Sequence, residues 1–288
     1  MIKDRNGNII ESNQKQNNIL RFLYNNAFGR ILLKPLTAPI ISEISGIFMD
    51  SALSVPIIKP FVKSNNINLS EYKSRKFTSY NDFFTRKIKS EKRPVDYRKS
   101  SLISPCDSKL TVYKINKNSI FKIKDSYYKT SDLIQNKFIA ERYRNGYCLI
   151  FRLCVDDYHR YCYIDNGIKN QNVFINGELH TVNPIALDKY NIYKRNCREF
   201  TIMHTENFGD VIQIEVGAML VGRIRNHHKN IYYFSKGAEK GLFEFGGSTI
   251  ILLFENNMID IDRDIFENSV QGIETVVKYG EKIGKKRL

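Results

Sequence analysis

The spacing of hydrophobic residues changes near residue 101 of this 288-residue chain. Before that point they recur every three or four positions, the period of an amphipathic helix. The first such set is Leu20, Leu23, Ala27, Phe28 and Ile31. After it they fall in short runs typical of strands, at 110–112, 120–123, 147–155, 173–175, 200–204, 211–216, 250–254 and 259–261. The sequence therefore predicts an α+β protein, with a helical region over 1–100 and a mainly antiparallel β barrel or sandwich over 101–288.

Prolines delimit two helices in the N-terminal region. Pro35 ends the first, and Pro39 is well placed as the first residue of the second. Their hydrophobic stripes could pack on the rest of the protein or lie in a lipid interface with cationic residues at the edges. Residues 35–58 contain Glu43, Asp50 and three prolines, so we expect no membrane-spanning helix there.

Two turns predict antiparallel hairpins. Asn176-Gly177 follows the run 173–175, and this dipeptide accepts the positive φ angles of a type I′ turn. The second turn, at 206–210, joins two of the longer runs. Both favour strands that pair with their neighbours in the chain.

The chain is strongly basic, and most of the excess lies near its N-terminus. It has 45 Lys and Arg against 30 Asp and Glu, a net charge of +15, and residues 1–100 contain 18 basic against 8 acidic residues. This charge points to nucleic acid or an anionic membrane, although a solvated lysine-rich surface explains it equally well. Residues 73–99 are the most basic, with Phe77, Phe83 and Phe84 among them. They could stack on single-stranded nucleic acid or face phospholipid.

The cysteines do not predict a disulfide framework or a metal site. There are five, at 106, 148, 154, 162 and 197, without a CxxC pair, so we expect free thiols. The histidines also form no convincing ligand set with neighbouring carboxylates, and no metal is predicted. The first 30 residues are too polar for a secretory signal peptide.

The segment 236–250, KGAEKGLFEFGGSTI, carries the first sign of chemistry. Gly246 and Gly247 precede Ser248 at the start of a hydrophobic run. Because glycine has no Cβ, it permits a tight turn and lets the Ser248 hydroxyl approach the carbonyl group of Gly247. Taken alone, Gly-Gly-Ser-Thr is a weak signal, since most such tetrapeptides lie in loops.

Other segments occur in the order and rough spacing of one known family. They are Tyr80-Asn-Asp-Phe-Phe-Thr-Arg86, Arg93-Pro-Val-Asp96, Ser104-Pro-Cys-Asp-Ser-Lys-Leu110, Asp157-Tyr-His-Arg-Tyr-Cys162, Asn183-Pro184, 216–224 and 236–241. The chain resembles the pyruvoyl-dependent, self-processing phosphatidylserine decarboxylases of prokaryotic type. The resemblance runs from about residue 70 to about residue 260 and, more loosely, includes the N-terminal helices.

The resemblance implies that the chain cuts itself between Gly247 and Ser248. In this family the serine hydroxyl attacks the preceding carbonyl group, and the resulting ester is lost by β-elimination. The dehydroalanine left behind becomes a pyruvoyl group. The products would be a β chain, 1–247, and an α chain, 248–288. We expect them to stay associated, because the run 250–254 reads as a core strand.

Activation of a serine at neutral pH needs a base and a group that orients the base. The resemblance assigns these roles to His159, in the Tyr-His-Arg motif, and to Asp107, in the Ser-Pro-x-Asp motif. Many members have a second histidine three residues after the first, where this chain has Cys162. Either His159 serves in both self-cleavage and decarboxylation, or Cys162 or another group replaces the missing histidine.

The activity implied by the resemblance is decarboxylation of phosphatidylserine to phosphatidylethanolamine and CO₂. The pyruvoyl group at position 248 would form a Schiff base with the substrate amine and accept the electrons released with CO₂, so no separate cofactor is expected. His159 is the candidate donor of the proton that returns to Cα. An ordinary histidine pKa of about 6.5 suits transfer in both directions.

The resemblance also makes phosphatidylserine in an anionic membrane the expected partner. We expect peripheral attachment at the cytoplasmic face of the cell membrane, where a basic surface would favour the anionic substrate over its nearly neutral product. A homodimer is left open, and no nucleic-acid partner is expected. Two alternatives remain: a pyruvoyl-dependent decarboxylase of a soluble amino acid, and a basic nucleic-acid-binding protein. The second would not account for the Gly-Gly-Ser-Thr and Asp-Tyr-His-Arg segments.

Overall fold

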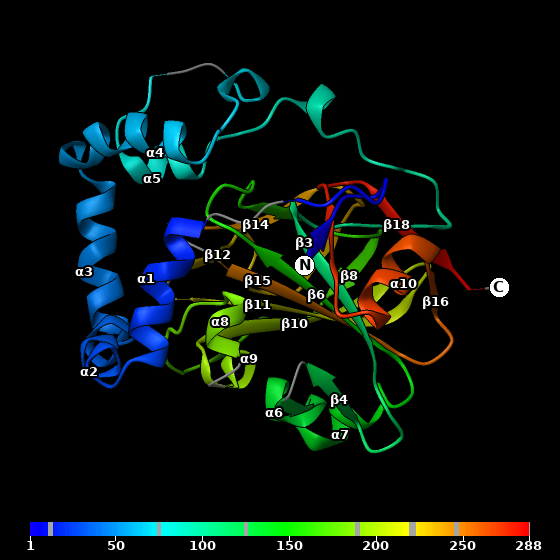
Figure 1. Ribbon diagram of the computed structural model, residues 1–288. Coiled ribbons are helices and arrows are strands. Elements are labelled where there is room, and N and C mark those ends of the chain that lie inside the picture. The colour runs from blue at the N-terminus through cyan, green and yellow to red at the C-terminus, as the bar shows by residue number, and fades with distance from the viewer. Residues whose placement is uncertain are drawn as a thin grey trace.

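A large sheet forms the centre of the molecule, and the N-terminal helices lie to one side of it (Figure 1). The computed structural model describes residues 1–10, 14–73, 76–123, 126–187, 191–218, 223–244 and 248–287. Helices α1 to α3 stand at one end of the sheet, while α10 lies at the other (Figure 1). The α+β class predicted from the sequence is confirmed.

The central sheet contains ten strands from the described part of the chain, in the order β1-β17-β3-β6-β15-β11-β10-β8-β13, with β9 also paired to β10. The strands are β1 (Ile2–Lys3), β3 (Ser108–Lys114), β6 (Tyr147–Leu153), β8 (Gly167–Lys169), β9 (Val173–Ile175), β10 (Arg198–Thr205), β11 (Gly209–Val216), β13 (Tyr232–Phe234), β15 (Ser248–Phe254) and β17 (Glu274–Val277). All pairs are antiparallel except β1 with β17. All seven residues of β15 are buried, as its unbroken hydrophobic run predicts for a central strand.

Smaller sheets complete a sandwich-like arrangement. Their orders are β12-β14-β7, β16-β18-β2 and β4-β5. The strands are β2 (Ser101–Ile103), β4 (Ile120–Ile123), β5 (Ser126–Lys129), β7 (Arg160–Cys162), β12 (Ile224–Asn226), β14 (Glu239–Phe243), β16 (Ile259–Ile261) and β18 (Lys282–Lys286). The fully buried ion pair between Lys240 of β14 and Glu215 of β11 joins the first of these sheets to the central one. The described strands form no closed barrel, because the end strands β1 and β13 are not paired with each other. The barrel alternative is therefore wrong.

The single helix predicted around residues 20–31 is two helices. The helices and helical turns are α1 (Gln14–Asn25), α2 (Ala27–Leu36), α3 (Pro39–Asp50), η1 (Ala52–Ile57), α4 (Ile58–Ser64), η2 (Leu69–Glu71), α5 (Tyr80–Phe84), η3 (Ser90–Lys92), α6 (Thr130–Ile134), α7 (Lys137–Glu141), α8 (Pro184–Leu187), α9 (Ile192–Arg195) and α10 (Arg263–Val270). Asn26 separates α1 from α2, because its side chain accepts hydrogen bonds from the backbone N–H groups of Phe28 and Gly29. Pro39 begins α3, as predicted.

Helices α1 to α3 leave a hydrophobic face uncovered. The exposed helix face consists of residues that are each 43% to 66% exposed: Ile19, Phe22, Phe28, Ile31, Leu32, Ile40, Ile44, Ile47 and Phe48. The stripes that the sequence identified are thus only partly used for packing. Within the described ranges, no single helix is long and apolar enough to cross a membrane, and only α2 with α3, bent by 66°, meets the length and composition criteria as a pair.

The chain begins in the central sheet, before the helices. Strand β1 pairs with β17, and the side chain of Arg5 forms ion pairs with Asp262 and Glu281 at 3.0 and 3.2 Å. These first residues lie in the range 1–100 that the sequence predicts to be helical. Two residues of strand are too short to show a periodicity of their own.

One predicted hairpin is confirmed and the other is wrong. Strands β10 and β11 form the hairpin around 206–210, with Gly209 at a φ of 69°. At Asn176-Gly177 the chain does not reverse, and β9 pairs with β10 instead. Gly177 has no positive φ, but a Cβ on it would lie 2.1 Å from the carbonyl oxygen of Arg195. The glycine is needed for this close approach of two backbone segments, not for a turn.

Candidate functional site

Ser248 begins the central strand of the protein. It lies opposite Leu153 of β6 and is fully buried, and its hydroxyl has no hydrogen-bond partner among the described residues. A buried hydroxyl without a partner is unfavourable in a core strand, so such a group needs an explanation. Gly246 and Gly247, the residues before it, lie outside the described ranges.

The sheet β12-β14-β7 places His159 close to the chain that leads to this serine. His159 directly precedes β7, and its carbonyl oxygen accepts a 3.0 Å hydrogen bond from the backbone N–H of Phe243. Phe243 is the last residue of β14, five positions before Ser248. Strand pairing, and not nearness in the sequence, therefore positions His159.

The His159 ring is held as a neutral base. Its Nδ1 donates to the carbonyl oxygen of Asp157 at 2.9 Å, and because a carbonyl oxygen can only accept, the lone pair is on Nε2. Nε2 is buried and has no described hydrogen-bond partner. The ring of Phe84 packs on the imidazole with 4.2 Å between centroids. Burial lowers the pKa of His159 to about 3. The ordinary pKa assumed from the sequence is therefore wrong for the uncut chain.

The backbone that supports His159 is anchored by an ion pair that sequence reasoning missed. Lys109 of β3 donates to both carboxylate oxygens of Asp157, at 2.6 and 2.8 Å, and both side chains are buried. The backbone N–H of Cys154 donates to the same carboxylate. Lys109 lies in the Ser-Pro-Cys-Asp-Ser-Lys segment and Asp157 in the Asp-Tyr-His-Arg segment. The pair between Lys109 and Asp157 thus joins the two motifs. The lysine in the first motif and the aspartate in the second were the sequence signal from which this ion pair could have been predicted.

Asp107 has other partners than the predicted base. Its buried carboxylate accepts hydrogen bonds from Arg93, the shortest at 2.6 Å, and from the backbone N–H of Tyr279 at 2.8 Å. Lys278 lies 3.7 Å away. In the described structure it makes no hydrogen bond to His159. It links the segment before β2 to the C-terminal segment, and its role in self-cleavage stays a prediction.

Cys162 occupies the position at which the family resemblance implies a second histidine. Its thiol lies 4.0 Å from the carbonyl oxygen of Ser104, and burial raises the pKa of the thiol to about 12. A thiol with that pKa stays protonated at neutral pH and cannot serve as a base there. All five cysteines are free, as expected.

One group of side chains has the spacing of metal ligands. The ligand atoms of Cys154, Asp156 and Asp157 lie within 4.8 Å of one another. The carboxylate of Asp157 is already paired with Lys109, so this group does not by itself indicate a metal centre.

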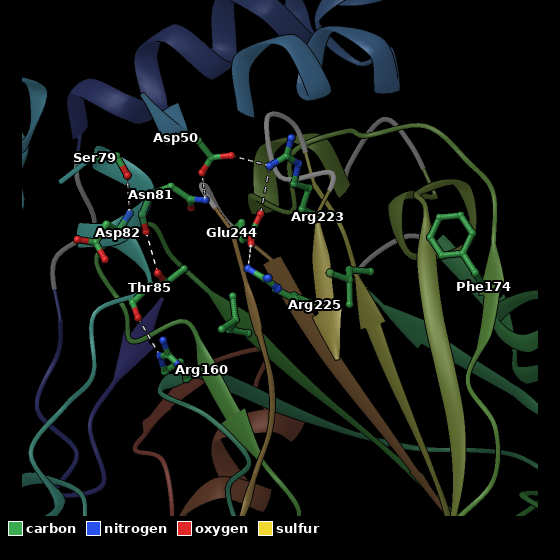
Figure 2. Close-up of a pocket in the computed structure, with 12 residues that line it drawn as sticks. Asp50, Ser79, Asn81, Asp82, Thr85, Arg160, Phe174, Arg223, Arg225 and Glu244 are labelled. Carbon is green, nitrogen blue, oxygen red and sulfur yellow. Dashed lines mark hydrogen bonds and ion pairs between the residues drawn. The ribbon is translucent and has the colours of Figure 1, made fainter. Parts of the chain in front are cut away.

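A polar cavity of about 650 Å³ lies between the helical region and the sheet that carries His159 (Figure 2). Charged residues that line it are Asp50, Asp82, Arg160, Arg223, Arg225 and Glu244. Arg223 contacts both Asp50 of α3, at 2.7 Å, and Glu244, just after β14, at 3.5 Å (Figure 2). Arg160 donates to the carbonyl oxygen of Thr85 at 2.8 Å. This last bond joins the Phe-Phe-Thr-Arg and Tyr-His-Arg segments.

Known proteins resemble this chain over almost its whole length. Residues 80–285 match the family model described as phosphatidylserine decarboxylase. The chain is 50% identical to phosphatidylserine decarboxylase proenzyme 2 of Clostridium acetobutylicum over 273 residues, which cover 94% of this chain and 93% of that protein. Phosphatidylserine decarboxylase proenzymes of Clostridium botulinum strain Langeland and Clostridium tetani are 45% and 44% identical, each over 93% of this chain and 92% of the relative. This chain therefore belongs to the phosphatidylserine decarboxylase family, as its motifs predicted.

Proposed function

We propose that this chain is a proenzyme that cuts itself between Gly247 and Ser248 and then decarboxylates phosphatidylserine to phosphatidylethanolamine and CO₂. The observation that carries the proposal is Ser248, at the first position of a fully buried strand, whose hydroxyl has no hydrogen-bond partner among the described residues. Relatives that cover nearly the whole chain are named phosphatidylserine decarboxylase proenzymes. The pyruvoyl group made from Ser248 would supply the electron sink that decarboxylation of an amino acid needs.

His159 is the base that self-cleavage requires. Its neutral ring offers Nε2, which no described residue contacts by a hydrogen bond and which can accept the proton of the Ser248 hydroxyl. Asp157, anchored by Lys109, fixes the tautomer through its carbonyl oxygen. The raised pKa of the Cys162 thiol argues against the alternative that this cysteine replaces the missing histidine as base. His159 as the proton donor in decarboxylation stays a prediction, because burial keeps its ring neutral in the uncut chain.

The two cleavage products would remain interleaved. The proposed α chain, 248–288, supplies β15 between β6 and β11, β17 between β1 and β3, and β18 beside β2. Its Glu274 also pairs with the buried Arg152 at 2.6 Å. Separation would expose a hydrophobic core strand and break three sets of strand pairings, so we expect the chains to copurify.

We also propose a peripheral position on an anionic membrane, and the exposed helix face supports this proposal. A hydrophobic surface of this extent needs a partner, and exposed cationic residues on α1 and α2, including Arg21, Arg30 and Lys34, suit lipid phosphates. The charged cavity beside His159 suits a headgroup that carries an ammonium, a carboxylate and a phosphodiester. These features favour a phospholipid over a soluble amino acid as substrate.

The intact mass of the purified protein tests this proposal. We expect two polypeptides, with the small one matching 248–288 and its first residue present as a pyruvoyl group. Ser248→Ala should remain one chain and release no CO₂ from phosphatidylserine. Thr249→Val is the matched control, because Thr249 is equally buried and unpartnered but points to the other face of β15. A wild-type chain that stays uncut, or an active Ser248→Ala, contradicts the proposal.

A further inference from the structure

Four arginines are buried among the described residues. Arg160 pairs with Glu239 at 2.6 Å, and the other three differ in how their guanidinium groups are satisfied. Arg152 pairs with the carboxylate of Glu274 through two hydrogen bonds, at 2.6 and 2.7 Å. Arg198 has no carboxylate partner but donates to four backbone carbonyl oxygens, those of Asp132, Leu133, Lys194 and Asn196. Both groups are therefore well supplied with acceptors, as buried charges require.

Arg86 is the exception. It is 1% exposed, yet it forms no ion pair with any described residue. It donates only to the carbonyl oxygen of Phe83, at 3.3 Å, and to the hydroxyl of Tyr72, at 3.1 Å, while its Nε has no partner. The guanidinium lies 4.2 Å from the ring of Tyr72 and 4.7 Å from that of Phe83. Ring faces attract a cation but do not satisfy its N–H groups.

This cation lies next to the proposed catalytic base. Phe84, two residues before Arg86, packs on the ring of His159. After burial itself, the positive charge of Arg86 contributes to the lowered pKa of His159. The cavity in Figure 2 is lined by Thr85 and Arg160, which are the chain neighbours of Arg86 and His159. Arg86 and His159 do not line the cavity themselves, so a ligand there would lie one residue along the chain from each of them.

We propose that Arg86 binds an oxyanion of the substrate headgroup beside His159. A buried guanidinium with free N–H groups and no counter-ion is suited to phosphate or carboxylate oxygens. The inference rests on the proposed function, because phosphatidylserine offers both anions. The phosphodiester is the better candidate, since it keeps its charge throughout the reaction. A cation held on the carboxylate would be more strongly paired before CO₂ leaves than in the transition state, which opposes catalysis.

Kinetics of processed Arg86 variants test the proposal. We expect Arg86→Met to fold and cut itself, and to raise the KM for phosphatidylserine about tenfold to a hundredfold, the range for a lost charged hydrogen bond. Arg86→Lys should give a smaller rise. Arg198→Met is the matched control: it removes another buried guanidinium and should lower thermal stability without changing KM. A folded Arg86→Met that stays uncut would place Arg86 in self-cleavage and overturn the proposal, as would an unchanged KM.

Tyr72→Phe gives a prediction of opposite sign that does not depend on an Arg86 variant folding. The substitution removes one of the two acceptors of the guanidinium and leaves the ring in place. The released N–H group becomes available to the substrate oxyanion, so we expect the KM to fall below that of the wild type. An unchanged or raised KM would contradict the inference.

Two amine-free inhibitors identify the oxyanion. Glycerophosphoglycerol offers a phosphodiester alone and 3-hydroxypropionate a carboxylate alone. We expect Arg86→Met to weaken inhibition by the first and not by the second, and the reverse pattern would assign the carboxylate. Equal inhibition of wild type and variant by both compounds would overturn the inference. If the wild type itself releases no CO₂ from phosphatidylserine, the proposed function fails instead, so the two failures are distinct.

Discussion

At the scale of single residues, the candidate site contains buried polar atoms that have no hydrogen-bond partner in the described part of the chain. The Ser248 hydroxyl, Nε2 of His159 and Nε of Arg86 belong to this class. Most buried polar groups in proteins are hydrogen-bonded, because an unsatisfied one costs stability. The three groups come from separate segments of the chain, and each segment is one that the sequence analysis singled out. Seven other described residues, Thr249 among them, also bury a polar atom without a partner, so this feature indicates function only together with the motifs that contain these three groups.

Protonation of His159 should weaken the folded state in acid. Its pKa is about 3 in the fold and about 6.5 in an unfolded chain, so between these values only the unfolded state binds the proton. As the pH decreases through that window, His159 should therefore lower the free energy of unfolding of the Ser248→Ala precursor by about 1.4 kcal/mol per pH unit. This contribution adds to those of the other titrating groups. Above pH 6.5 the group contributes no slope.

His159→Gln in the same Ser248→Ala background removes this contribution. We expect its stability to depend less steeply on pH between 6 and 4, as measured by urea unfolding at several pH values. Parallel pH profiles for the two proteins would show that the ring is not kept neutral by burial.

At the scale of elements, ion pairs hold the C-terminal strands against segments from early in the chain. Asp107 accepts hydrogen bonds from Arg93 and from the backbone of Tyr279, between β17 and β18. Arg5, just after β1, contacts Asp262 before α10. These links cross the proposed cleavage site, so they would connect the two products. The Asp107 carboxylate, to which the family resemblance assigns a catalytic role, therefore also stabilises the contact between these segments.

Removal of this carboxylate should destabilise the fold. Asp107→Asn leaves the largely buried Arg93 with only the more distant Glu71, at 3.3 Å, as a charged partner, and we expect a loss of about 3 kcal/mol in the free energy of unfolding, measured by urea in the Ser248→Ala precursor. Arg93→Met is the matched variant, since it breaks the same pair but keeps the carboxylate. An unchanged free energy of unfolding in both variants would contradict a stabilising role for the pair between Asp107 and Arg93.

Self-cleavage of the same two substitutions, with Ser248 intact, tests the role that the family resemblance implies for Asp107. Loss of cleavage in folded Asp107→Asn, but not in Arg93→Met, would assign the carboxylate to the reaction. Cleavage in both would limit Asp107 to holding the segments together.

At the scale of the whole molecule, the exposed helix face and the candidate site are connected. Asp50 ends α3, which carries part of that face, and it bonds to Asn81 of α5 at 2.7 Å and to Arg223 (Figure 2). Arg223 in turn contacts Glu244, beyond the end of β14. The face proposed to meet a membrane and the cavity beside His159 therefore share one polar network. This arrangement suits a substrate whose headgroup must leave the lipid surface to react.

Charge on the exposed helix face should abolish membrane binding. We expect Ile31→Glu combined with Ile44→Glu to prevent flotation with vesicles that contain phosphatidylserine, because each carboxylate would have to enter the lipid interface. Phe138→Glu is the matched control: Phe138 is 88% exposed, and its helix α7 lies away from α2 and α3 (Figure 1). Self-cleavage should persist in all of these proteins.

Neutralisation of Lys73, Arg75 and Lys76 by glutamine should weaken the same binding at low salt and leave self-cleavage intact. Arg75 lies outside the described residues. A different result for Ile31→Glu combined with Ile44→Glu would contradict the membrane proposal. If this variant still floats with the vesicles, and a dimer of the wild type becomes a monomer in it, the exposed helix face is an interface between copies of the chain.

Local sequence patterns predicted secondary structure correctly where a single interaction determines the local conformation. The continuous hydrophobic run of β15 predicted a central strand, and Gly209 allowed the predicted hairpin. Asn26 divided a predicted helix because a side-chain cap competes with the helical hydrogen bonds, a choice that periodicity does not reveal. Gly177 was misread because a glycine needed for close approach resembles one needed for a turn until its neighbours in space are known.

The sequence by itself determined the family, the α+β class, the serine at which the chain is proposed to cut itself and the segments that contain the residues proposed to assist this reaction. Motif chemistry and hydrophobic periodicity depend on neighbours in the chain, so they can be read from it. Only the tertiary structure decided that Lys109 anchors Asp157, that Asp107 binds Arg93, and that His159 is buried as a neutral base. Partners and pKa values depend on burial and on residues far away in the sequence, and these are fixed only when the strands have paired.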